Sequence, residues 1–331
     1  MLTGNLSLQF SKNMQSEKKE HASKRLHVRN RNRDRYDLNA LLISNPELKE
    51  YVKPNHFGDD SIDFSSPMAV KLLNKSLLNH YYGIANWDFP DENLCPPIPG
   101  RADYLHHIAD LLAENNFGVI PTGETFICLD IGVGASCIYP ILGVTEFAWQ
   151  FIGSDIDPKS IASAQHIVDA NKSLKNKITF RLQKNPRAIF KGIIGDSEKI
   201  DLTICNPPFH TSLEDAQEGT LRKIKNLSGK TEKTPVLNFA GNGNELVFNG
   251  GEFQFIQNMI SDSKMVSKNC YWFSTLVSKQ SNLKGIYRSL EKNGAIQIKT
   301  LAMGTGNKSS RIVAWTFLSK PEQKEWRETR W

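Results

Sequence analysis

Four consecutive residues, Asn206-Pro207-Pro208-Phe209, follow the apolar run IDLTIC (200–205), which is typical of a buried strand. Proline cannot donate to a sheet ladder, so Pro207 and Pro208 are expected where the strand has ended. Proline also fixes φ, which holds the neighbouring backbone carbonyls rigid. The stretch therefore combines an amide oxygen, rigid carbonyl acceptors and an aromatic ring. Because Asn-Pro commonly opens turns, a simple strand terminator is the alternative interpretation.

A glycine-containing loop follows an earlier apolar run in LDIGVGAS (129–136). Gly132 and Gly134 allow a tight turn and a close approach of a ligand to the backbone. Asp155 ends the next apolar run, about 23 residues after Gly132, where an acid can bind ribose hydroxyls. This order predicts a site for an adenosine-containing cofactor. The alternative is that the glycines only make a turn and that Asp155 caps the following helix.

Two further features of this loop narrow the cofactor. The third glycine of the dinucleotide pattern is missing, since Ser136 and Cys137 occupy that region, which disfavours NAD. Asp130, at the end of the strand, is the acid typical of S-adenosylmethionine enzymes of this architecture. There it orders the loop and faces the amine of the methionine moiety.

The two motifs are expected to share one crevice, because ligands of open parallel sheets sit outside the carboxyl ends of the strands. An exocyclic amine on adenine is a poor nucleophile, since its lone pair is delocalised into the ring. The Asn206 side-chain oxygen and the Pro207 carbonyl can accept its two N–H hydrogens and draw it toward a tetrahedral geometry. Phe209 offers a ring for a flipped-out base, worth about 1–3 kcal/mol. We therefore expect methyl transfer to a planar, amine-bearing group.

The elements that must position these residues alternate between strand and helix, which favours a doubly wound α/β fold. The last two strand-like runs are close enough to form an antiparallel hairpin. Helices are expected at 65–84, with Ser66 as cap and Pro67 at its first position, around 102–114, at 139–144 and at 158–171. The expected strands lie at 124–134, 147–157, 177–183, 200–209, 269–278, 295–303 and 311–318.

Four parts of the chain are expected from its composition along the sequence. Residues 1–22 are polar and without periodicity, typical of a disordered tail. A basic, helical N-terminal region (23–115) precedes a catalytic domain (116–320). That domain contains a long polar and glycine-rich insertion (210–262). Residues 321–331 are expected to be a C-terminal tail.

The chain of 331 residues carries a formal net charge of +6. Six cations and one acid lie in KRLHVRNRNRDR (24–35), a run that suits a polyanion, although a solvated tail is the alternative. No signal-peptide core and no apolar run long enough to span a membrane are seen, so a cytoplasmic protein is expected. Five scattered cysteines favour reduced packing residues over disulfides or a metal site. They are Cys95, Cys128, Cys137, Cys205 and Cys270.

Six stretches together resemble the bacterial large-subunit ribosomal RNA adenine-N6 methyltransferase F family. The chain is similar, more distantly, to the eukaryotic methyltransferase-like 16 relatives of that family. One departure is Val28, where the pattern of the family has proline. The stretches are LHVRNRNRDRYDL (26–38), DFSSPMAVKLLN (63–74), CPPIPGRADYLHHIADLL (95–112), LDIGVGASCIYPILG (129–143), CNPPFHTS (205–212) and FNGGEFQFIQNMI (248–260).

The resemblance implies a class I, Rossmann-like S-adenosylmethionine-dependent methyltransferase with a seven-stranded, mostly parallel sheet. It implies one adenine of 23S rRNA, position 1618 in ribosomal numbering, as the substrate, either in the naked rRNA or in a large-subunit assembly intermediate. It also implies that Arg101 and Ser136 lie near the cofactor carboxylate and that Asn185 contacts the adenine moiety. The expected RNA contacts are Arg29, Arg31, Arg33 and Arg35.

Other functions remain open at the level of sequence. A protein glutamine-N5 methyltransferase can use the same Asn-Pro-Pro-aromatic motif on a side-chain amide, although the basic run 24–35 argues against it. A non-catalytic RNA-binding protein would have no need of Asp130, Gly132 and Asn206. DNA is a further option, because the motif contacts the base and not the 2′-hydroxyl.

Overall fold

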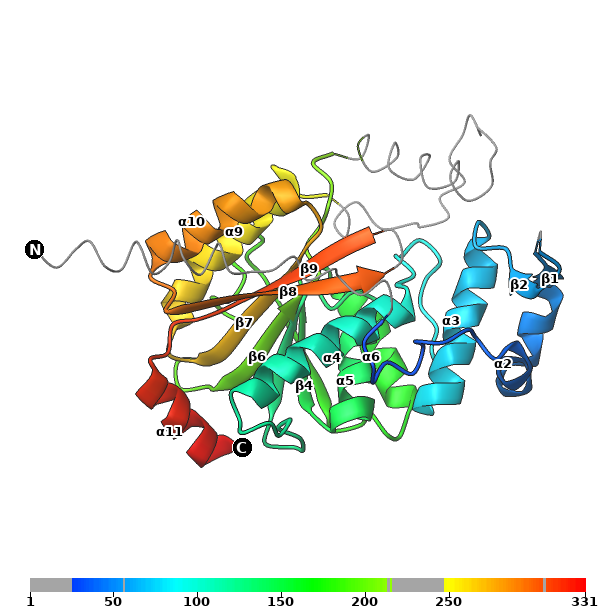
Figure 1. Cartoon of the computed structure of the whole chain (residues 1–331), viewed down its shortest axis with the longest axis horizontal. Coiled ribbons are helices and arrows are strands. Elements are labelled where there is room, and N and C mark those ends of the chain that lie inside the picture. Colours follow the sequence, from blue (N-terminus) through cyan, green and yellow to red (C-terminus); the bar gives the residue numbers. More distant parts are fainter. Residues whose placement is uncertain (1–25, 56, 213–214, 216–246, 306–307) are drawn as a thin grey trace, which may run out of the picture.

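The computed structural model describes residues 26–55, 57–212, 215, 247–305 and 308–331, and its centre is a seven-stranded sheet (Figure 1). The strand order is β5-β4-β3-β6-β7-β9-β8. Within this sheet, the strands β3 to β7 pair in parallel, whereas β9 is antiparallel to both β7 and β8. The strands are β3 (Ile127–Ile131), β4 (Gln150–Asp155), β5 (Ile178–Leu182), β6 (Ile200–Cys205), β7 (Cys270–Val277), β8 (Gln297–Thr305) and β9 (Lys308–Thr316). The predicted strands and the terminal hairpin are thus confirmed.

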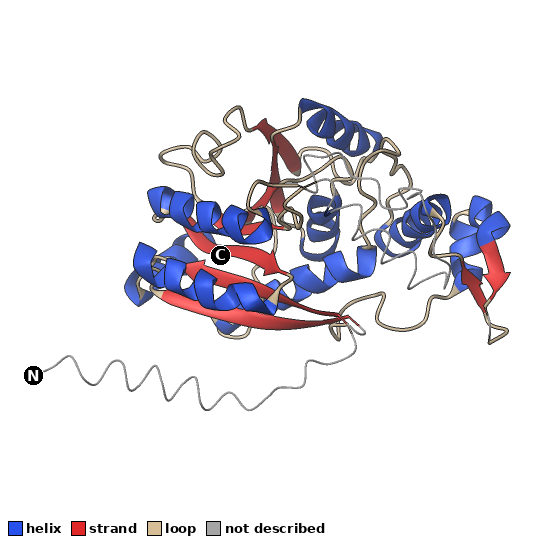
Figure 2. Cartoon of the chain, turned by 90° about the horizontal axis from the view of Figure 1, so that it is seen from above, coloured by secondary structure: helices blue, strands red, loops and turns tan. Residues whose placement is uncertain are grey.

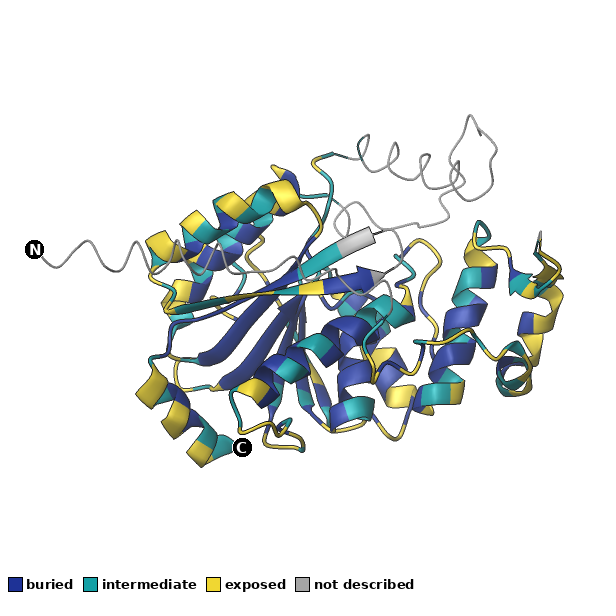
Figure 3. Cartoon of the chain, in the orientation of Figure 1, coloured by how far each residue is buried: buried dark blue, intermediate teal, exposed yellow. Residues whose placement is uncertain are grey.

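Helices cover both faces of the sheet (Figure 2). On one face lie α4 (Ile98–Glu114), α5 (Ile138–Phe147) and α6 (Pro158–Ala170); on the other lie α9 (Gly251–Ser263) and α10 (Leu283–Asn293). Short 3₁₀ turns, η2 (Lys264–Val266) and η3 (Gln280–Asn282), follow α9 and precede α10. A sheet covered on both faces needs apolar residues throughout, and β6 and β7 are buried along their whole length (Figure 3).

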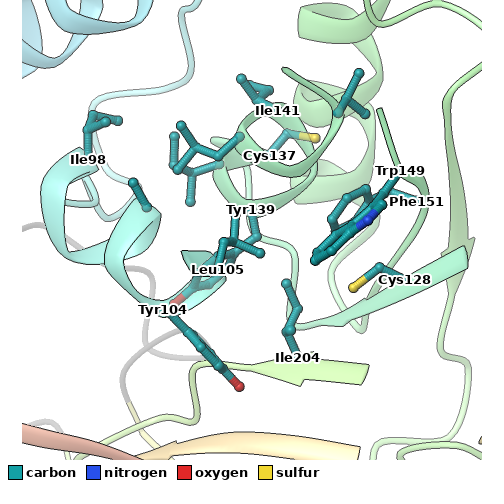
Figure 4. Packing of buried hydrophobic residues seen from close by; sticks show 14 of the residues in the cluster. Ile98, Tyr104, Leu105, Cys128, Cys137, Tyr139, Ile141, Trp149, Phe151 and Ile204 are labelled. Atoms are coloured by element: carbon teal, nitrogen blue, oxygen red, sulfur yellow. The ribbon is translucent and has the colours of Figure 1, made fainter. Parts of the chain in front are cut away.

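The N-terminal region shares its hydrophobic core with the sheet. One cluster of buried residues extends from Leu41 through the helices α3 (Pro67–Tyr82), α4 and α5 to Trp326 near the C-terminus. Figure 4 shows part of it, with Tyr104 of α4 and Tyr139 of α5 close to Ile204 of β6. Trp149 stacks on Phe126, with ring centroids 4.5 Å apart. The boundary expected at residue 115 therefore does not separate two cores.

The N-terminal region contains a small hairpin as well as helices. It runs through α2 (Leu38–Ser44), η1 (Pro46–Tyr51), the strands β1 (Val52–Pro54) and β2 (Asp60–Ile62), and α3 (Pro67–Tyr82). The predicted limits of α3 are confirmed, because the Ser66 side chain accepts from the Ala69 N–H and Gly83 ends the helix at φ +68°. The hairpin was not anticipated, since strands of three residues leave little periodicity.

The C-terminal residues expected to be a tail form helix α11 (Lys320–Arg330). Its anchor is Asp201, a fully buried residue of β6. The Asp201 carboxylate accepts from the indole N–H groups of Trp326 and Trp331 (2.7 and 2.8 Å) and from the Arg330 guanidinium (2.7 Å). It also accepts from the backbone N–H of Ile127 (2.8 Å), so it joins α11 to the start of β3.

No helix within the described ranges is both long and apolar enough to cross a membrane.

Replacing Asp201 with Ala is expected to lower the free energy of unfolding by about 3–5 kcal/mol, because the Arg330 guanidinium and two indole N–H groups lose a buried acceptor. Urea denaturation measures this change. The control is Lys324→Ala, which removes an exposed i,i+4 pair with Glu328 (3.7 Å) and should change stability by less than about 0.5 kcal/mol. Equal effects of the two substitutions would contradict the role of Asp201.

Candidate active site

A cavity opens at the carboxyl ends of the central strands, where the strand order reverses between β3 and β6. The register pairs Asp130 with Ile204 and Ile131 with Cys205, so the segments that follow β3 and β6 leave the sheet side by side. Seven of the residues predicted for the site line the cavity, namely Arg101, Gly132, Gly134, Ser136, Asp155, Asn206 and Pro208. The expectation of one shared crevice is therefore met by the fold.

The glycine loop is held by backbone hydrogen bonds to β4. The N–H groups of Gly132 and Val133 both donate to the Ser154 carbonyl (2.9 and 3.0 Å), and the Gly134 N–H donates to the Asp155 carboxylate (2.9 Å). Gly132 and Gly134 have φ of +73° and +64°, a conformation that favours glycine. A Cβ at Gly132 would meet no atom within 4 Å, so the space beside this backbone is open.

Asp155 does not cap the helix that follows it. The cap of α6 is Asp157, whose side chain accepts from the Lys159 N–H. Asp155 instead accepts from Gly134 and from the Asp157 N–H (2.9 Å each), and its burial raises its pKa. This arrangement removes the capping alternative and leaves Asp155 on the cavity wall.

Asp130 is a buried carboxylate without a hydrogen-bond partner for either oxygen within the described structure. Burial is the main cause that raises its pKa well above the usual value, and the nearby Asp155 carboxylate adds to it, while Arg101 opposes the shift. A buried carboxylate is costly unless a cation or donor meets it. A ligand with an ammonium group, such as the methionine moiety of S-adenosylmethionine, would supply both, so the residues fit this cofactor.

The Asn206 side chain lies half-buried at the cavity and is bonded to Arg101 of α4. The Arg101 Nη1 donates to the Asn206 Oδ1 (3.0 Å) and to the Tyr139 hydroxyl (3.2 Å). Within the motif, Pro207 is buried, whereas Phe209 is half-buried and does not line the cavity. The hydrogen bond from Arg101 is thus made to the oxygen of the amide.

Buried polar groups support the strand end beneath the motif. The Tyr104 hydroxyl lies 2.9 Å from the Ser274 Oγ, which donates to the Thr203 carbonyl (2.6 Å). Helix α4 is thereby joined to both β6 and β7 directly below Asn206.

Asn185 is placed in an exposed turn next to the cavity but is not among the lining residues. Its side-chain oxygen accepts from the Arg187 N–H (3.0 Å), and its own N–H donates to the Gln183 side chain (2.9 Å). Gln183 and Arg187 do line the cavity. The predicted contact of Asn185 with the adenine moiety stays a prediction, and this turn contributes other side chains to the wall.

The last part of the expected insertion (247–262) completes the wall of the cavity, a role that the sequence analysis did not assign to it. Val247 forms a bridge with His210, and the Phe248 N–H donates to the His210 carbonyl (3.0 Å). Phe248, Phe255 and Asn258 line the cavity. The signal was the stretch FNGGEFQF (248–255), whose aromatic residues flank two glycines.

Two residues of this segment contact neighbouring loops, one after the motif and one after β7. A Cβ at Gly251 would come within 2.9 Å of the Thr211 side chain, so α9 begins directly against this loop. The buried Glu252 carboxylate accepts from the Ser278 N–H (2.7 Å) and the Asn282 side chain (2.7 Å). Most of the expected insertion, including Glu245, lies outside the described residues.

Three of the four arginines expected to contact RNA form ion pairs within the protein. Arg29 pairs with Asp110 (2.7 Å), Arg31 with Glu146 (2.7 Å) and Arg35 with Asp59 (2.6 Å). Arg33 is half-buried and has no ion pair among the described side chains. The basic run is therefore a segment docked on the helices, with part of its charge neutralised.

Buried side chains between the arginines anchor this segment to α3 and α4. Asn30 donates to the Pro99 carbonyl (2.9 Å), and Asn32 donates to the Tyr82 hydroxyl (3.2 Å). The His27 ring lies 2.7 Å from the Asp110 carboxylate. His106 packs beside it, and burial lowers the pKa of His106 to about 4, so this imidazole is neutral at ordinary pH.

In the part of the chain that the structure describes, no group of three or more His, Cys, Asp or Glu side chains could hold a metal ion.

The strand order, the glycine loop and the acid after β4 define a class I methyltransferase. Residues 20–319 match the family model described as RNA methyltransferase, and the chain belongs to this family. It is 54% identical over 316 residues to the ribosomal RNA large subunit methyltransferase F of Cytophaga hutchinsonii, covering 95% of this chain and 98% of that protein. It is 52% identical to the protein of the same name from Photobacterium profundum, covering 97% and 98%.

Solved structures of METTL16 share the fold. The catalytic domain of hMettl16 in complex with MAT2A 3′UTR hairpin 1 has a TM-score of 0.74 and 28% identity, covering 89% of this chain and 96% of that one. The N-terminal domain of human METTL16 in complex with SAH has a TM-score of 0.69 and 26% identity, covering 89% and 99%.

Replacing Asp130 with Asn should weaken binding of S-adenosylhomocysteine by about tenfold or more, because a neutral amide cannot balance a buried ammonium group. Isothermal titration calorimetry measures the affinity. In the native protein, affinity should also rise as the pH is increased through the raised pKa of Asp130, because the free carboxyl must lose a proton as the cation binds.

The Asp130→Asn variant should lack this component of the pH dependence. An unchanged affinity and an unchanged pH profile would show that the ammonium group does not bind at Asp130.

Proposed function

We propose that this protein transfers the methyl group of S-adenosylmethionine to the exocyclic N6 of one adenine, position 1618, in 23S rRNA, acting in the cytoplasm. The observation that carries the proposal is one cavity lined by both Asn206 and the glycine loop. Asp130, whose buried carboxylate has no hydrogen-bond partner within the described structure, lies in the strand that leads into this loop. The relatives named ribosomal RNA large subunit methyltransferase F support the choice of large-subunit rRNA. The resemblance of the sequence to that family supplies the base and its position.

The cofactor would be held by residues of the glycine loop and its neighbours. Asp130 would meet the ammonium group, and Asp155 would face the ribose hydroxyls from the wall of the cavity. The open space beside Gly132 permits a close approach to the backbone. When bound, S-adenosylmethionine supplies a methyl group on a positively charged sulfur, which an amine nitrogen can displace.

The Asn-Pro-Pro-Phe motif would position the amine. The Asn206 Oδ1 and the Pro207 carbonyl accept the two N–H hydrogens of the exocyclic nitrogen, which draws its lone pair out of the ring. Because Pro207 and Pro208 fix the backbone, these acceptors need no reorganisation during transfer. Phe209 stacks on the extruded base. No general base is required first, since the methylated nitrogen is acidic and loses its proton afterwards.

The rival functions are weakened by the same residues. A non-catalytic RNA-binding protein would bear the cost of burying Asp130 without a partner for no benefit. A glutamine-N5 methyltransferase would not need the arginine-bearing segment that Asn30 and Asn32 dock on α4 and α3. The RNA-bound structure of the hMettl16 catalytic domain further favours RNA as the substrate class.

Asn206→Ala is expected to lower kcat by about 10²-fold or more and to leave the affinity for S-adenosylhomocysteine unchanged, because it removes an acceptor for the amine but no contact of the glycine loop. The assay uses tritiated S-adenosylmethionine and 23S rRNA from a strain that lacks the gene, with wild-type rRNA as the control. Label at one adenine of the deficient RNA, and none in wild-type RNA, supports the proposal.

Turnover of the Asn206→Ala variant at the native rate would remove the proposed role of the motif. Assays on naked 23S rRNA and on large-subunit precursor particles identify the form of the substrate. Labelling of a release factor instead of either RNA would favour the glutamine-N5 alternative.

Arg33→Ala should weaken binding to 23S rRNA fragments and reduce the slope of log Kobs against log[salt] by about one, because one phosphate contact is lost. Arg33 is the informative position, since the other three arginines have acidic partners. Fluorescence anisotropy at several salt concentrations measures both quantities. Lys324→Ala, on α11 at the opposite end of the strands, is the control, and an equal effect of both variants would contradict the prediction.

A further inference from the structure

Arg101 connects the N-terminal region to the residue that is proposed to hold the target amine. It lies in the first turn of α4, and its Nη1 donates to the Asn206 Oδ1 (3.0 Å). The same nitrogen donates to the Tyr139 hydroxyl (3.2 Å), and the guanidinium lies 5.5 Å from the centre of the Tyr139 ring. The resemblance to the family implies only that Arg101 lies near the cofactor. It does not explain the hydrogen bond from Arg101 to Asn206.

The chemistry of the pair determines which atom of the amide faces Arg101. A guanidinium has five N–H donors and no acceptor, so only the oxygen of the Asn206 amide can bond to it. A carbonyl oxygen has two lone pairs, and one of them remains available for the N–H of an incoming amine. If the amide were rotated by half a turn, its NH₂ group would meet that N–H instead, donor against donor.

The surroundings hold Arg101 in place. Burial raises the pKa of Tyr139 to about 12, so its hydroxyl stays neutral and is a stable partner for the guanidinium. Asp130 also interacts electrostatically with Arg101, on the cofactor side of the cavity. Arg101 thus interacts both with the carboxylate proposed for the cofactor and with the amide proposed for the base.

We propose that Arg101 is a positioning residue that fixes the orientation of the Asn206 amide, so that its oxygen and not its nitrogen faces the target amine. This inference rests on the proposed function, because the role of the amide oxygen is defined by methyl transfer to an amine. It goes beyond a contact with the cofactor, since the effect on the reaction acts through Asn206.

Three variants test the proposal. Arg101→Met keeps the length and apolar contacts of the side chain and removes its donors, whereas Arg101→Lys retains one cationic donor group. Arg327→Met is the matched control. Arg327 of α11 makes an equivalent hydrogen bond to a tyrosine hydroxyl, that of Tyr271 (3.2 Å). Thermal unfolding establishes that each variant is folded.

At saturating cofactor and RNA, Arg101→Met should lower kcat by about 10- to 100-fold, since a misplaced catalytic group loses the productive geometry. Arg101→Lys should recover part of that loss, and Arg327→Met should resemble the native enzyme. Isothermal titration with S-adenosylhomocysteine separates the two roles of Arg101. A decrease confined to cofactor affinity, with native kcat at saturation, would overturn the proposal.

Asn206→Asp supplies a further comparison, because the two oxygens of a carboxylate are equivalent and need no orientation. Adding Arg101→Met to this background should lower kcat by a smaller factor than in the native background. Equal factors in both backgrounds would show that Arg101 does not act through the amide.

A measurement independent of turnover keeps this test separate from the test of the proposed function. The side-chain NH₂ signals of Asn206 in ¹⁵N-labelled protein are identified by their loss in Asn206→Asp. They should form one sharp pair in the native protein and become broadened or doubled in Arg101→Met, as two orientations exchange. An unchanged sharp pair would overturn the proposal, whereas absence of turnover by the native protein on every RNA would refute the proposed function alone.

Discussion

The parallel pairing of β3 with β6 is the constraint on which the site depends. With Asp130 opposite Ile204 and Ile131 opposite Cys205, the next residues of both strands leave the sheet together. One chain turns through Gly132 and Gly134, and the other turns through Asn206 and two prolines. Because the strand order reverses here, the loops after the two strands diverge, and the space between them forms the cavity. A shift in this register would separate the proposed cofactor site from the proposed amine site.

Helix α4 connects the N-terminal region to that carboxyl edge of the sheet. Its first turn carries Arg101, which bonds to Asn206, and its middle carries Tyr104, which supports the end of β6 through Ser274. Its last two turns hold the docked basic segment through Asp110. The proposed RNA-binding segment and the proposed catalytic amide are therefore attached to one rigid element, although they are far apart in the sequence.

Two buried aspartates in this fold, Asp201 and Asp130, differ in whether their carboxylates have hydrogen-bond partners. Asp201 is buried with a full set of donors from α11 and β3, which is how a structural carboxylate is accommodated. Asp130 is equally buried and has no partner for either oxygen in the described structure. Within the described structure, no hydrogen bond offsets the cost of desolvating the Asp130 carboxylate, so a cationic ligand explains its burial better. The comparison of these two aspartates separates stability from function without reference to any relative.

The sequence by itself determined the strands of the central sheet, the glycine loop, the acids near the ends of β3 and β4 and the Asn-Pro-Pro-Phe motif, because each is a local pattern that can be recognised without a fold. It also indicated that the motifs share one edge, since parallel strands have only one carboxyl edge. Only the tertiary structure decided that Asp157 and not Asp155 caps α6, and that Arg29, Arg31 and Arg35 are paired with acids distant in sequence. The same holds for α11, whose anchor is a buried residue far upstream, and for the hydrogen bond between Arg101 and Asn206. These features depend on contacts between residues far apart along the chain, and no local spacing specifies which distant partner a side chain will meet.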